Sequence, residues 1–165
     1  MTGTRGPVPL WADRAAQATL WCVLPSGIWR ILFGLGFPVS GLDGMREPWL
    51  LPYVILLSVL AEGAAFLGMG LVRGWGEVWP RWIPVLRGRT IHPLAAIIPA
   101  SLGAAALVWL WTPLIHGFPS DPDNPAVIDD GALTVITVCY LPLLAWGPLL
   151  AAVTVAYAVR RRRYG

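Results

Sequence analysis

Two charged residues lie inside long apolar stretches, and they are the residues of this sequence best placed to do chemistry. Glu62 is the charged residue of the stretch 51–72, and Arg30 lies in the stretch 15–37. A carboxylate in an apolar environment can take up and release a proton, and a nearby guanidinium can hold an anion or tune that carboxylate. The pair could therefore serve as an acid/base or proton site for a lipophilic molecule.

Helical geometry places the two side chains where they can meet. If both stretches are membrane helices, Glu62 lies about 16 Å from the outer boundary of its span, and Arg30 lies about 10 Å from that boundary. Ser58 and Ala65 share the helical face of Glu62, and Ser26 shares the face of Arg30. These small side chains indicate that both faces point into a helix bundle. Arg30 is thus the natural partner of Glu62.

Two interpretations of this pair remain open. In the first, an ion pair between Arg30 and Glu62 holds two helices together. In the second, the same residues form a catalytic, proton, ion or substrate site, which makes Glu62 and Arg30 the candidate catalytic residues. We favour the structural interpretation, because an intact buried pair needs no further purpose whereas a broken one is costly.

The rest of the sequence offers little chemistry. It contains no phosphate-binding loop, zinc motif, nucleophile elbow or dinucleotide fingerprint. His92 and His116 fall at opposite membrane faces and cannot form one metal site. The acidic segment 117–132 lacks the spacing of a calcium-binding loop and is interpreted as a hydrated loop. We predict no metal, no cofactor and no nucleic-acid binding.

Composition identifies the class of protein. Of the 165 residues, 56% are hydrophobic and 13% are charged, whereas a soluble domain carries about 25% charged residues. So little polar surface could not cover one soluble core, and disorder requires the opposite composition. The sequence therefore predicts an integral membrane protein.

Four apolar stretches are long enough to cross a bilayer, which takes about 20 helical residues. They span residues 15–37, 51–72, 94–115 and 133–159. We predict an all-α fold, a four-helix transmembrane bundle that forms a single domain over residues 1–165. Pro142 and Pro148 make the fourth span the least ideal helix of the four.

The arginines predict the orientation. All twelve basic residues are Arg, and ten of them fall in the N-terminal segment, the loop 73–93 or the C-terminal tail. Cytoplasmic segments attract Arg and Lys, so this loop and both termini should be cytoplasmic, with loops 38–50 and 116–132 outside. The predicted location is a bacterial plasma membrane.

Tryptophan and arginine mark a candidate interface in the cytoplasmic loop. Its members are Trp75, Trp79, Arg81, Trp82, Arg87 and Arg89. They could bind anionic lipid or a partner protein, although an anchored, solvated loop is the simpler interpretation. Trp21, Trp29 and Trp146 fall deeper in their spans, and we expect them to pack between helices.

Three segments carry a resemblance: Leu24-Pro-Ser-Gly-Ile-Trp-Arg, the stretch from Trp75 to Pro84, and Leu144-Ala-Trp-Gly-Pro-Leu-Leu. The chain resembles a group of small, uncharacterised multi-pass membrane proteins of actinobacteria. The resemblance implies a plasma-membrane location and no particular activity.

The leading functional hypothesis is a non-enzymatic assembly or accessory subunit of the membrane, in contact with the lipid bilayer and with a membrane-protein partner or further copies of itself. The alternative is an intramembrane enzyme or small carrier for a lipophilic substrate that uses Glu62 with Arg30. A homo-oligomeric channel would require one of these two residues to line a water path.

Overall fold

The computed structural model describes residues 7–37, 49–73, 92–116 and 130–164, and it is helical with no strand in these ranges. Its helices are α1 (Leu10–Leu35), α2 (Leu50–Met69), α3 (Pro93–His116), α4 (Asp130–Tyr140) and α5 (Leu143–Tyr164). The candidate interface from Trp75 to Arg89 lies outside the described residues.

The all-α prediction is confirmed, and four helices in the described chain are long and apolar enough to cross a membrane. They are Leu10–Leu35, Leu50–Met69, Pro93–Pro113 and Thr134–Arg163. The first span begins at residue 10 rather than 15, directly after Pro9, whose carbonyl accepts hydrogen bonds from Ala12 and Asp13. The segment 10–14, which includes the charged residues Asp13 and Arg14, is thus helical as well, because its backbone groups are satisfied locally.

The fourth span consists of two helices, α4 and α5, which are separated by Leu141 and Pro142. Pro142 has no backbone N–H and cannot continue the helical hydrogen-bond pattern. The N–H groups of Leu144 and Ala145 donate to the carbonyls of Leu141 and Pro142, at 3.2 and 3.1 Å. The span that was predicted to be least regular is therefore broken at its first proline.

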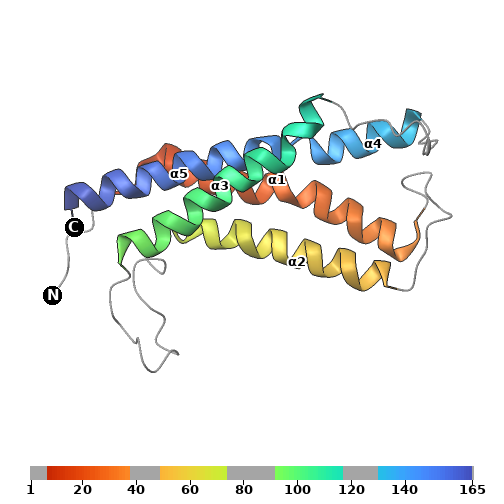
Figure 1. Cartoon of the computed structure of the whole chain (residues 1–165), viewed down its shortest axis with the longest axis horizontal. Coiled ribbons are helices and arrows are strands. Elements are labelled where there is room, and N and C mark those ends of the chain that lie inside the picture. Colours follow the sequence, from red (N-terminus) through yellow and green to blue (C-terminus); the bar gives the residue numbers. More distant parts are fainter. Residues whose placement is uncertain (1–6, 38–48, 74–91, 117–129, 165) are drawn as a thin grey trace, which may run out of the picture.

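Figure 1 shows the helices running between two ends of an elongated bundle, with α3 crossing diagonally. At one end α1 begins, α2 ends, α3 begins and α5 ends; we call it the arginine end because the described arginines other than Arg30 lie there. Helix α1 packs against both α2 and α5, and α3 packs against α5. The bundle is thus built as two helix pairs, α1–α2 and α3–α5, that are joined along α1 and α5.

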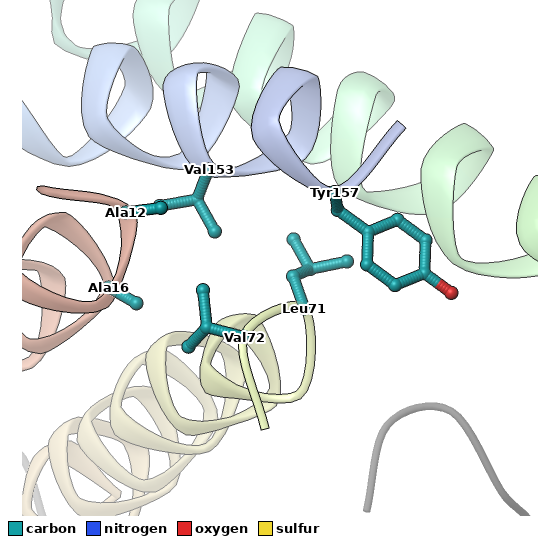
Figure 2. Close-up of a cluster of buried hydrophobic side chains, with 6 residues drawn as sticks. All are labelled: Ala12, Ala16, Leu71, Val72, Val153 and Tyr157. Atoms are coloured by element: carbon teal, nitrogen blue, oxygen red, sulfur yellow. The ribbon is translucent and has the colours of Figure 1, made fainter. Parts of the chain in front are cut away.

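Two buried clusters hold the helices together. At the arginine end, Figure 2 shows side chains from α1, the turn after α2 and α5 meeting in one cluster: Ala12, Ala16, Leu71, Val72, Val153 and Tyr157. Nearer the middle, Val23 and Ala65 pack with Leu143 and Trp146. Most other large apolar side chains are exposed, as expected for a surface that faces lipid rather than water.

One expectation for the deep tryptophans was wrong. Trp146 is buried, and Trp29 stacks on Phe33 with ring centroids 5.5 Å apart. The side chain of Trp21, however, is 71% exposed. Helix α1 turns the face of Thr19 and Val23 toward its neighbours, so Trp21 points away from them.

Candidate functional site

Arg30 is buried in the bundle and is held by its own helix. Its side chain is 7% exposed. Its Nε donates to the backbone oxygen of Ser26 and its Nη2 donates to Ser26 Oγ, both at 3.1 Å. The Ser26 hydroxyl in turn donates to the carbonyl of Val23 at 2.8 Å. Helix α1 therefore supplies acceptors for a guanidinium that apolar surroundings would otherwise leave unsatisfied.

Glu62 reaches across from α2 to the same part of α1. A Cβ atom on Gly27 would lie 3.4 Å from Glu62 Oε1, so the absence of a side chain at Gly27 leaves room for the carboxylate. Glu62 is half-buried, while Ser58 and Ala65 on the same helix are buried. The expected small, inward-facing surface is thus present on α2.

Arg30 and Glu62 lie close enough for their charges to attract. Among the described residues, however, no direct ion pair joins them, and the Arg30 guanidinium donates hydrogen bonds to Ser26. The structure therefore brings the two predicted residues to one helix interface.

Tyr140 is a neighbour of this pair that the sequence did not single out. It ends α4, and Arg30 also acts electrostatically on its hydroxyl. The Tyr140 ring lies 5.6 Å from that of Trp29 and 5.8 Å from that of Trp111, measured between centroids. Pro142 was the sequence feature that could have indicated Tyr140. A proline break in the fourth span determines which residue ends α4, and that residue lies beside α1.

Neither charged residue lines a described groove. The first groove, of about 510 Å³, lies between α2 and α3 with α5 as its floor, and we call it the α2–α3 groove. Its walls include Ala64, Gly68, Ala100, Gly103, Trp146 and Leu150. Ala64 follows Glu62 by two residues, which places the two side chains about 200° apart around the helix. The groove and the carboxylate therefore occupy different faces of α2.

A second groove, of about 570 Å³, lies between α3 and α5, and we call it the α3–α5 groove. Its walls include Ser101, Ala105, Trp109, Thr112, Ala151 and Thr154. The hydroxyls of Thr112 and Thr154 donate to carbonyls of their own helices. No titratable side chain lines either of the two described grooves.

The arginine end carries a cluster of positive charge. Arg73 pairs with Asp13 at 3.2 Å, and Arg160 Nη2 donates to the Leu71 carbonyl at 3.1 Å. The guanidinium carbons of Arg160 and Arg161 lie 5.7 and 5.8 Å from the centroid of the Tyr157 ring. These contacts hold two arginines of α5 over the turn that follows α2.

Within the described ranges, no group of three or more His, Cys, Asp or Glu side chains could hold a metal ion. Comparison with known proteins finds no matching family model, no matching curated protein and no matching solved structure. The functional argument therefore rests on the geometry of this chain.

Proposed function

We propose that this chain is a multi-pass protein of a bacterial plasma membrane, with both termini in the cytoplasm, that acts as a non-enzymatic assembly or accessory subunit. The observation that carries the proposal is the separation of charge from grooves. Acid/base chemistry requires a titratable group within hydrogen-bond reach of the substrate. Arg30 instead donates to Ser26 of its own helix, Glu62 lies over Gly27 of α1, and neither lines one of the two described grooves.

The α3–α5 groove supports a role in assembly. Helix α3 is the least buried of the four spans, and Ser101 and Ala105 are small residues four positions apart on its groove-facing side. Small residues at this spacing let helices approach closely in a bilayer, where packing and hydrogen bonds drive association. We assign this groove to a helix of another membrane protein or of a second copy.

The orientation and location rest on the charges. The described arginines other than Arg30 gather at one end of the bundle, and cytoplasmic segments carry such an excess. The resemblance to small actinobacterial membrane proteins adds the bacterial plasma membrane to the proposal. In this proposal, the residues from Trp75 to Arg89 form a further docking surface for the partner or for anionic lipid.

A photo-crosslinking residue at position 105 tests the assembly role in native membranes. The matched control places the same residue at Gly63, which faces open space on α2. We expect one discrete crosslinked complex from position 105, none from position 63, and the same complex when Glu62 is replaced by Gln. Equal crosslinking from both positions would contradict the proposed interface.

The competing hypothesis makes Glu62 reactive. If it is correct, Glu62→Gln should reach the membrane at the wild-type level and yet fail to complement a deletion strain. In our proposal this variant complements, whereas Ala105→Leu, which fills the groove, does not. Gly63→Leu again serves as the control for added bulk.

A further inference from the structure

One face of α5 connects the α2–α3 groove to the arginine end. Trp146 and Leu150 line the groove, and Val153 and Tyr157 belong to the buried cluster of Figure 2. With Arg160 these residues follow a spacing of four, three, four and three, which places them on one stripe of a helix. The stripe is apolar along the groove and ends in arginine.

The turn after α2 joins the same two features. The Leu71 side chain lines the α2–α3 groove, while its carbonyl accepts the hydrogen bond of Arg160. Ala96 and Ala100 of α3 line the groove and also pack against the buried cluster that contains Tyr157. The groove therefore reaches the arginine end directly beside Arg160.

A buried polar group at this junction lacks a partner. The Tyr157 side chain is 1% exposed, and its hydroxyl has no hydrogen-bond partner among the described residues. Figure 2 shows the ring beyond Leu71, with its hydroxyl directed away from Ala12 and Ala16. Buried hydroxyls are normally satisfied, so this one indicates a polar ligand group beside the two guanidinium groups that lie over its ring.

Charge defines the ligand. The described residues of the arginine end contribute six arginines against one carboxylate: Arg14, Arg73 and Arg160 to Arg163 against Asp13. Guanidinium groups bind phosphate through paired N–H donors, and basic pockets between membrane helices bind phospholipid headgroups. A partner helix lying in the groove would bring apolar side chains against these guanidinium groups, which favours a lipid as the occupant.

We infer that the α2–α3 groove and the arginine end form one binding site for an anionic phospholipid. One acyl chain lies in the groove along Gly68, Gly103 and Leu150, and the phosphate accepts hydrogen bonds from Arg160, Arg161 and the Tyr157 hydroxyl. The inference rests on the membrane location in the proposed function and is independent of the accessory role.

The test uses the full-length protein purified in a neutral detergent, with phosphatidylglycerol, phosphatidylcholine or inorganic phosphate as the added probe. Native mass spectrometry counts retained lipids, and the unfolding temperature measures stabilisation, because a ligand that binds the folded state raises it. We expect one phosphatidylglycerol molecule to be retained and to stabilise the protein more than phosphatidylcholine does. Inorganic phosphate, which has no chain, should give little stabilisation.

Two pairs of variants locate the site. Arg160→Gln with Arg161→Gln should weaken phosphatidylglycerol binding by about 25-fold, since each arginine near an anionic lipid contributes about fivefold. Arg162→Gln with Arg163→Gln makes the same charge change at exposed positions and should have a much smaller effect. Gly103→Leu should exclude the acyl chain, whereas Gly63→Leu, which faces open space, should not.

Arg160 also holds the turn after α2, so its replacement could unfold the chain. In that case the Gly103 and Gly63 variants, in which both arginines are intact, test whether the groove binds the acyl chain.

Equal retention of both lipids, or wild-type phosphatidylglycerol binding by Gly103→Leu, overturns the inference. Stabilisation by inorganic phosphate alone reduces the site to an anion site without a chain. A dimer that Gly103→Leu abolishes assigns the groove to a second copy. None of these outcomes affects the crosslink from position 105, so the two proposals fail separately.

Discussion

The two helix pairs of this bundle are held by different forces. The α1–α2 pair encloses polar groups, namely Arg30 with its acceptor Ser26 on one helix and Glu62 on the other. The described residues of the α3–α5 pair include no carboxylate, and the buried Thr154 hydroxyl donates to Leu150 of its own helix. There Gly147 lets α5 approach the α3 backbone: a Cβ on Gly147 would lie 3.1 Å from Val108 N and 3.2 Å from the Ala104 carbonyl oxygen.

The difference shows two solutions to one problem. Lipid is as apolar as the helices, so burial of apolar surface does not drive helix association inside a bilayer. The α1–α2 pair adds charge attraction to close packing at Gly34, where a Cβ would lie 2.6 Å from Val54 Cγ2, whereas the α3–α5 pair depends on backbone proximity at Gly147. The first interface should therefore respond to changes of charge as well as of volume, and the second to changes of volume.

The largest effect should come from removing the positive charge of the α1–α2 pair. Arg30→Met leaves the Glu62 carboxylate in apolar surroundings without a compensating charge, and we expect a loss of about 3 kcal/mol of unfolding free energy. Adding Glu62→Gln should restore most of that loss. Denaturant titration of the single and double variants measures the coupling, and purely additive effects would contradict an electrostatic interaction.

A smaller effect should come from adding volume to the α3–α5 pair. Gly147→Ala places a Cβ 2.8 Å from Val108 Cγ2 and against backbone atoms that cannot rotate away, and we expect a loss of about 2 kcal/mol. Gly63→Ala, in open space, should leave stability unchanged or raise it slightly through helix propensity. If both variants unfold at the same denaturant concentration, close backbone approach at Gly147 does not contribute to the stability of the α3–α5 pair.

The smallest effect should come from the hydroxyl that supports Arg30. Ser26→Ala removes the bond from Arg30 Nη2 as well as the Ser26 bond to Val23. Ser58→Ala removes only a bond from a buried hydroxyl to its own helix, at Val54, and is the matched control. Ser26→Ala should cost about 0.6 kcal/mol more than the control, a typical value for a hydrogen bond in a membrane protein. Equal unfolding free energies would show that Ser26 does not help to hold Arg30.

The sequence predicted the helices better than the site. Long apolar runs specify membrane helices locally, because each backbone group must be satisfied within its own segment in lipid. Pro142 likewise indicated the irregular fourth span. The direct ion pair between Arg30 and Glu62 was an inference from depth along two helices, and depth does not fix side-chain rotamers. The Arg30 guanidinium instead donates to acceptors on Ser26, one helical turn away.

The local sequence pattern also failed to predict which tryptophan side chains are exposed. Trp21 and Trp146 both lie deep in apolar spans, yet Trp21 is exposed and Trp146 is buried. A membrane helix is apolar on every side, so its sequence lacks the polar stripe that marks the outer face of a soluble helix. Only the packing partners of α1 and α5 distinguish these two tryptophans.

By itself the sequence determined the class of fold, the four spans and the two charged residues that lie within them, because hydrophobicity and helical hydrogen bonding act along the chain. The tertiary structure decided that Glu62 lies over Gly27, that the α2–α3 groove opens on the other face of α2, and that this groove reaches Leu71, whose carbonyl accepts the hydrogen bond of Arg160. Those relations join residues far apart in sequence, and they depend on how helices with nearly uniform apolar surfaces pack against one another.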